Sequence, residues 1–182
     1  RLSIPICSVL RPRNKTGSYC ELDLNDIRKK IDKENPNGIL IIPSDNPTGY
    51  QMSQNSIIEI AKMCVEKNIW LISDEAYRNI YYTENGPTSI WNISDKVVPG
   101  INGRRISIES VSKVWNACGL RIGALVTDNK AMFDKVRSEY TANLCANVIG
   151  QYIFGAIADL SSDKIVEWYK MQRAYYSEII TD

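Results

Sequence analysis

Two short, wholly apolar runs separated by an amphipathic segment restrict this chain to a sheet with parallel strands. The runs cover residues 38–43 and 69–72, and neither alternates apolar with polar residues, which is typical of strands buried on both faces. Between them, Ser53 is a candidate helix cap, and the apolar residues after it recur at helical spacing: Ile57, Ile60, Ala61, Cys64 and Val65. The order strand, helix, strand predicts two parallel strands joined by a right-handed crossover.

Further strands extend this unit. Residues 104–109 and 122–127 are both strand-like, and the segment between them is too short for a helical crossover, so we expect them to pair antiparallel. Residues 2–10 are apolar but contain Pro5, which restricts them to an edge strand or an irregular one. The sequence thus predicts a mostly parallel sheet with one antiparallel strand near residues 121–127.

Helices occupy the remaining segments. Asp23 is a candidate cap for a helix that ends near Lys33, and Asp128 is a candidate cap for the first of the helices that fill the C-terminal part. The strongly apolar residues 148–160 are typical of a core or a subunit interface. We expect one domain over residues 1–182, an α/β protein folded as a three-layer α/β/α sandwich with a helical C-terminal part.

The composition argues against several classes of function. Lysine and arginine total 22 against 21 acidic residues, so no basic surface for nucleic acid is indicated, and no apolar run is long enough to cross a bilayer. The five cysteines are odd in number and lack Cys-x-x-Cys spacing, which favours a reducing compartment over a disulfide framework or a zinc ribbon. Histidine is absent, which excludes Ser-His-Asp and Cys-His nucleophiles and His-ligated metal sites. We therefore expect a cytoplasmic protein without nucleic-acid, membrane or metal partners, whose chemistry depends on Lys, Asp, Tyr and Ser.

Polar motifs follow three of the predicted strands, at the point where each strand ends. Asn46 follows the strand at residues 38–42, Asp74 follows the strand at 69–72, and Ser110 follows the strand that ends near Glu109. In open α/β sheets, ligands bind beyond the carboxyl ends of the strands. The sequence therefore predicts one ligand site at this edge of the sheet.

The motifs resemble those of a known enzyme family. Three of them, in order and spacing, are similar to the signatures of the fold-type I pyridoxal-phosphate aminotransferases of class I/II: Asn46-Pro47-Thr48-Gly49, Asp74-Glu75-Ala76-Tyr77, and Ser110-Val111-Ser112-Lys113 followed by Arg121-Ile122-Gly123. The resemblance implies pyridoxal 5′-phosphate as the cofactor and amino-group transfer between an amino acid and a 2-oxo acid. It also implies a homodimer, in which a neighbouring subunit contributes to each site.

The resemblance implies a catalytic role for one residue. Lys113 would form a Schiff base with the cofactor aldehyde, and the amine, once displaced by substrate, would move a proton between the substrate and the cofactor. Such a lysine must be able to lose its charge, which requires a surrounding that lowers the pKa of the amine. The alternative for Lys113 is a solvated surface lysine. The family spacing of Ser110 and Arg121 around it favours the catalytic interpretation.

Cofactor-binding roles are implied for the other matching residues. Asp74 would keep the pyridine nitrogen protonated, Asn46 and Tyr77 would hydrogen-bond the phenolic oxygen, and Ala76 would lie against the ring. The phosphate would be bound by a planar guanidinium and two hydroxyls, from Arg121, Ser110 and Ser112. Asp74 could equally cap a following helix, Tyr77 could simply pack, and the Asn46 motif could be only a turn. Glu75 receives no role.

The resemblance covers nearly the whole chain, but members of the family are roughly twice as long, more than one core usually supports. We therefore expect this chain to be the central part of a cofactor-binding large domain, without the N-terminal segment or the small C-terminal domain, and inactive by itself. A pyridoxal-phosphate lyase of the same fold would share every motif seen here. An aminotransferase-like effector domain of a transcription regulator and an unrelated doubly wound domain are further alternatives.

Overall fold

A computed structural model of the chain describes residues 4–142 and 145–181. Its strands are β1 (Gly38–Ile41), β2 (Trp70–Asp74), β3 (Arg105–Ser110) and β4 (Gly123–Thr127). Its α-helices are α1 (Leu24–Glu34), α2 (Gln54–Glu66), α3 (Val111–Val114), α4 (Lys130–Ala142), α5 (Val148–Gly155) and α6 (Ser162–Thr181). Three short 3₁₀ turns are η1 (Ile90–Asn92), η2 (Cys118–Leu120) and η3 (Ala156–Asp159).

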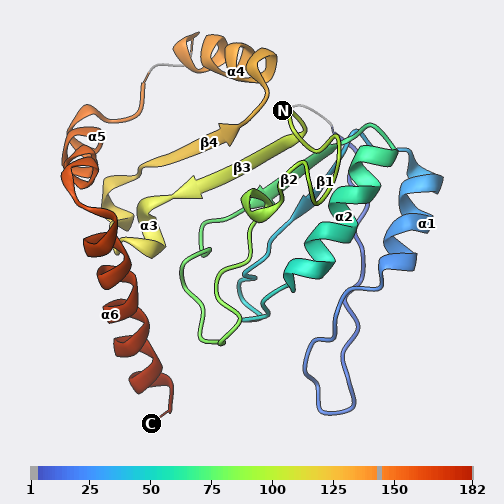
Figure 1. Ribbon diagram of the computed structural model, residues 1–182, viewed down its shortest axis with the longest axis horizontal. Helices are drawn as coiled ribbons and strands as arrows, with labels where there is room; N and C mark the ends of the chain where they lie inside the picture. Colours follow the sequence, from blue (N-terminus) through green and yellow to red (C-terminus); the bar gives the residue numbers. More distant parts are fainter. Residues whose placement is uncertain (1–3, 143–144, 182) are drawn as a thin grey trace.

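The four strands form one mixed sheet in the order β1-β2-β3-β4 (Figure 1). β1, β2 and β3 are parallel, and β3 pairs antiparallel with β4. The predicted α/β class, the βαβ unit and the antiparallel strand near residues 121–127 are therefore confirmed. The connection from β2 to β3 contains η1 but no α-helix among the described residues.

Helix caps follow the predictions except at one position. The carboxylate of Asp23 accepts from the backbone N–H groups of the first turn of α1, and the Ser53 hydroxyl accepts from the N–H of Ser56 at the start of α2. Asp128 does not cap α4, so that prediction is wrong. Asn129 does so instead, because its Oδ1 accepts from the N–H of Met132 (2.8 Å), while Asp128 faces the guanidinium of Arg105 on β3 (Nε to Oδ2, 2.9 Å).

The core lies between one face of the sheet and the helices α1 and α2. Its fully buried members include Ile57, Ile60 and Cys64 of α2 and Leu71 of β2. Burying these apolar side chains is the main stabilising contribution to the fold. The helical part from α4 to α6 continues from β4, and α5 and α6 run past α3 (Figure 1).

Other apolar residues stay exposed. On the sheet face opposite Leu71, the side chains of Leu40 and Leu125 are 60% and 45% exposed. The apolar stretch at residues 148–160 does not enter the core, since Val148 and Tyr152 are 67% and 85% exposed. Of the two alternatives predicted for this stretch, the exposed side chains do not form a core in this chain, and the subunit interface stays a prediction. No helix in the described part of the chain is both long and apolar enough to cross a membrane.

The core position of α2 gives a first test. Ile60→Ala should lower the free energy of unfolding by about 3 kcal/mol, because it removes a buried side chain and leaves a cavity. Lys62→Ala, on the exposed side of the same helix, should change it by less than about 0.5 kcal/mol. Urea unfolding followed by circular dichroism measures both. Equal effects of the two substitutions would contradict the observed orientation of α2.

Candidate functional site

The predicted site residues gather where the parallel strands end. Asp74 is the last residue of β2 and Ser110 the last of β3, and Asp74 pairs in register with Ile108. Because side chains alternate along a strand, Asp74, Ile108 and Ser110 lie on the same face of the sheet. The expected convergence at the carboxyl edge is thus present in the structure.

Residues from two other segments contact Tyr77, which follows Asp74 by three positions. The amide of Asn46 donates from Nδ2 to the hydroxyl oxygen of Tyr77 (3.0 Å), across a gap of 31 residues in the chain. The ammonium nitrogen of Lys113, on α3, lies 5.8 Å from the centroid of the Tyr77 ring. Asn46 and Lys113 are exposed, and Tyr77 is half-buried. Among the described residues, no carboxylate pairs with Lys113, so its amine is accessible to a ligand.

Asp74 keeps part of its hydrogen-bonding capacity unused. Its Oδ1 accepts from the backbone N–H of Ala76 (3.1 Å), which closes a turn rather than starting a helix. Within residues 4–142 and 145–181 no cation pairs with this half-buried carboxylate, and Oδ2 accepts no hydrogen bond. A half-buried carboxylate of this kind favours a cationic or N–H-donating partner.

Two serines lie at the start of α3, and the segment that carries Arg121 runs beside them. The Ser110 hydroxyl accepts from the N–H of Ser112 (3.1 Å), which leaves its own proton free to donate. The backbone N–H of Val111 donates to the carbonyl of Ile122 (3.2 Å), so the segment carrying Arg121 runs beside Ser110. Arg121 is exposed, and its Nη1 donates to the carbonyl of Cys118 (3.0 Å). Together these donors suit a phosphate group.

A cluster of aromatic side chains from the C-terminal helices holds α3. Trp115, which follows α3, stacks on Trp168 of α6 with ring centroids 6.2 Å apart, and lies 5.2 Å from the ring of Tyr169. The indole of Trp168 also donates to the carbonyl of Val114 (3.2 Å). No local sequence pattern predicts this packing, because Trp168 lies 53 positions after Trp115 and 54 positions after Val114. The packing fixes the helix from which Lys113 projects.

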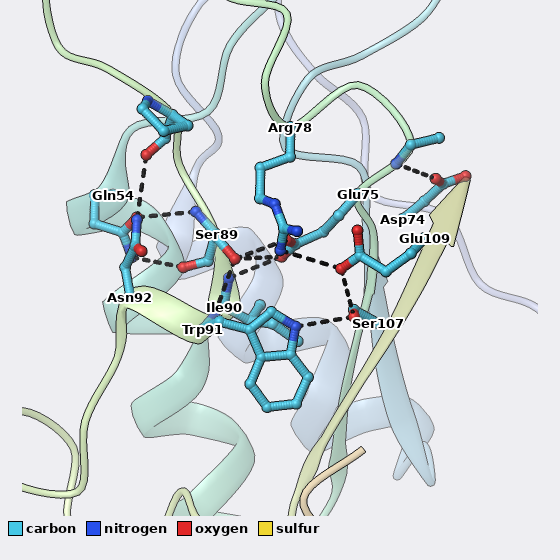
Figure 2. Close-up of polar contacts among 12 residues, drawn as sticks. Gln54, Asp74, Glu75, Arg78, Ser89, Ile90, Trp91, Asn92, Ser107 and Glu109 are labelled. Carbon is cyan, nitrogen blue, oxygen red and sulfur yellow. Dashed lines mark hydrogen bonds and ion pairs between the residues drawn. The ribbon is translucent and has the colours of Figure 1, made fainter. Parts of the chain in front are cut away.

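Glu75, which the sequence analysis left without a role, is the most enclosed charged group at this edge (3% exposed). Figure 2 shows its carboxylate accepting from the Ser89 hydroxyl (2.7 and 2.9 Å) and from the backbone N–H of Ile90 (2.9 Å). Arg78 completes the set with an ion pair of 2.8 Å. One signal was present in the sequence. Alternation after a buried strand turns the residue beyond Asp74 toward the opposite face, and a buried acid requires partners.

The same arginine reaches a second carboxylate. Nη1 of Arg78 lies 3.1 Å from Oε1 of Glu109, which also accepts from the hydroxyl of Ser107 (2.9 Å). Ser107 in turn accepts from the indole N–H of Trp91 (2.9 Å) (Figure 2). Burial raises the pKa of Glu109, while Arg78 and the Ser107 hydroxyl act in the opposite direction.

These contacts predict how Glu109 titrates. In Arg78→Met the pKa of Glu109 should rise further, because the positive charge that favours the carboxylate is gone. A carboxyl whose pKa is higher in the folded state than in the unfolded state adds to the free energy of unfolding at low pH. That contribution is lost as the pH rises through the raised pKa. The pH range in which this contribution to stability is lost should therefore extend to higher pH in the variant. NMR titration of the Glu109 side chain measures the pKa, with Arg28→Met, from an exposed ion pair with Glu66, as the control.

Comparison with known proteins places these features in a family. The model of the family described as "Aminotransferase class I and II" matches residues 12–179. A probable mitochondrial alanine aminotransferase of Dictyostelium discoideum is 37% identical over 131 residues, which cover 65% of this chain and 23% of that protein. A probable aspartate/prephenate aminotransferase of Aquifex aeolicus (strain VF5) is 28% identical over 153 residues, or 84% of this chain and 37% of that protein.

The fold comparison agrees. The crystal structure of a PLP-bound putative aminotransferase from Clostridium difficile 630 superimposes with a TM-score of 0.77 at 18% identity. The match covers 92% of this chain and 41% of that one. The chain therefore spans less than half the length of each relative described here.

Proposed function

The chain belongs to the class I and II aminotransferases, and on that premise we propose that its site binds pyridoxal 5′-phosphate and serves amino-group transfer between an amino acid and a 2-oxo acid. One observation carries the proposal. Asn46 and Lys113, from two separate segments, converge on Tyr77, three residues beyond the open carboxylate of Asp74 at the carboxyl edge of the sheet.

The ring of the cofactor fits the groups around Asp74. When bound, pyridoxal phosphate supplies an electron-withdrawing ring that stabilises negative charge at the substrate α-carbon. Asp74 would accept from the pyridine N–H and hold that proton in place, and the small side chain of Ala76 leaves room for the ring face. Because Asn46 donates to the oxygen of Tyr77, the Tyr77 hydroxyl proton is free to donate to the phenolic oxygen.

The remaining groups suit the aldehyde and the phosphate. Lys113 would supply the amine to which the aldehyde attaches, and the freed amine would carry a proton to or from the substrate α-carbon. Ser110, Ser112 and Arg121 would bind the phosphate, the serines by neutral donors and the arginine by its permanent charge.

The assembly and location of the protein are also part of the proposal. The exposed apolar residues of α5, such as Val148 and Tyr152, support a homodimer, because such side chains are favourably buried against another subunit. All five cysteines are free thiols, which supports the reducing environment of the cytoplasm.

Covalent trapping tests the role of Lys113. Incubation with pyridoxal phosphate should produce a visible absorption band, and borohydride should then fix the cofactor to Lys113, as located by peptide mass spectrometry. Lys113→Ala should lose the label, because its amine is absent. Lys62→Ala, from a lysine paired with Glu59 on α2, should keep it. Equal labelling of the Lys113→Ala protein would show that another lysine carries the cofactor.

Turnover is a separate prediction. We expect the 182-residue chain alone to bind the cofactor without detectable transaminase activity, because it spans less than half of its relatives and the family resemblance places part of the substrate site outside that region. Exchange between a panel of amino acids and 2-oxo acids measures this, with free pyridoxal phosphate as the background. Activity above that background would contradict the prediction, and release of ammonia with the oxo acid would favour a lyase.

A further inference from the structure

Strand alternation separates four acidic or hydroxyl groups into two pairs. Asp74 and Ser110, at the ends of β2 and β3, lie on the face of the proposed cofactor site. Glu75 and Glu109, each adjacent in sequence to one of them, point to the opposite face. The backbone N–H of Glu75 donates to the carbonyl of Ile108 (2.9 Å), so the two strand ends remain paired at this point.

Arg78 connects the second pair. A single nitrogen, Nη1, lies 2.8 Å from Oε2 of Glu75 and 3.1 Å from Oε1 of Glu109. The Glu75 side chain is fully enclosed, and those of Arg78 and Glu109 are 29% and 23% exposed. In this surrounding the guanidinium offsets the repulsion between two carboxylates that would otherwise push the strand ends apart.

Both carboxylates are themselves fixed from a common segment. Glu75 is held by the Ser89 hydroxyl and the N–H of Ile90, at the start of η1. Glu109 is held by Ser107, whose hydroxyl oxygen accepts from Trp91 of the same turn. Both carboxylates of the bridge, which consists of Glu75, Arg78 and Glu109, thus have a further hydrogen-bond partner. Figure 2 shows these residues on one continuous path of polar contacts. Such a connected network restricts the conformations of its members.

We propose that Arg78 is a positioning residue that sets the spacing between Asp74 and Ser110, so that one ligand contacts both at once. The inference rests on the proposed function, in which Asp74 binds the pyridine nitrogen and Ser110 the phosphate. The polar contacts of the Arg78 guanidinium in the described part of the chain are with Glu75 and Glu109, on the opposite face, and not with Asp74 or Ser110. Its contribution is to the pre-organisation of two anchors, which raises affinity only for a ligand that carries both groups.

The experiment compares three probes with the purified protein. Pyridoxamine 5′-phosphate carries ring and phosphate, pyridoxamine carries the ring alone, and inorganic phosphate carries the anion alone; none has an aldehyde that would react with other lysines. In Arg78→Met, the affinity for pyridoxamine 5′-phosphate should fall about 10-fold, while the affinities for the two single-group probes should change less than about 2-fold. Isothermal titration calorimetry measures all three.

Two further variants control the result. Arg28→Met removes an arginine from an exposed ion pair between α1 and α2, and should leave all three affinities unchanged. Glu109→Gln breaks the bridge from the β3 side and keeps Arg78, so it should reproduce the selective loss. It also keeps the test decisive if Arg78→Met fails to fold, which thermal unfolding of each variant would reveal.

The outcomes separate the alternatives. A loss of phosphate affinity equal to that of pyridoxamine 5′-phosphate would overturn the inference, since Arg78 would then act through its charge. Equal losses for all three probes would also overturn it and show a general structural role. Unchanged binding of every probe in both bridge variants would reject the inference and leave the proposed function standing. No binding of pyridoxamine 5′-phosphate by the unsubstituted protein would reject the proposed function itself.

Discussion

The parallel pairing of β2 with β3 is the constraint on which the rest of the site depends. It places the ends of two strands at one edge, with Asp74 and Ser110 on one face and Glu75 and Glu109 on the other. A shift of β3 by one residue along β2 would turn Glu109 toward the site and Ser110 away from it. The backbone hydrogen bonds of this register thus bring the proposed cofactor groups to one edge and one face of the sheet, where side-chain contacts can adjust their spacing.

Side-chain contacts on the opposite face of the sheet hold the strand ends, and contacts from the C-terminal helices hold α3. The bridge through Arg78 joins the strand ends, and stacking of Trp115 on Trp168 anchors α3, from which Lys113 projects. At the other end of β3, the buried Arg105 donates to Asp128 and to the carbonyl of Ile93, which fastens β4 and η1 to the same strand. β3 is therefore held at both ends by an arginine.

The sequence predicted those features whose causes are local. Caps at Asp23 and Ser53 depend on the next three residues, and the antiparallel β4 follows from the shortness of the segment before it. The cap at Asp128 was predicted wrongly because its partner, Arg105, lies 23 positions away, and no local pattern reveals that competition. For the apolar stretch at residues 148–160, the sequence leaves a core and a subunit interface open for a related reason, since apolarity alone does not say which surface covers it.

The candidate site was partly predictable for a different reason. Strand ends and motif spacing located Asn46, Asp74 and Lys113, whereas the residues that hold them in place, such as Arg78 and Trp168, showed no recognisable spacing.

Hydrogen-bonding capacity separates the two groups. The oxygens of Glu75 and the Nη1 of Arg78 are occupied by protein partners. In the described part of the chain, Oδ2 of Asp74, the hydroxyl proton of Tyr77 and the amine of Lys113 have no protein hydrogen-bond acceptor or donor assigned to them. An unused polar group near the interior is unfavourable unless a ligand or water completes it, so these open groups are the ones we expect to contact a ligand. By the same reasoning, we expect Glu75 and Arg78, which contact each other within the protein, to position the site rather than to bind in it.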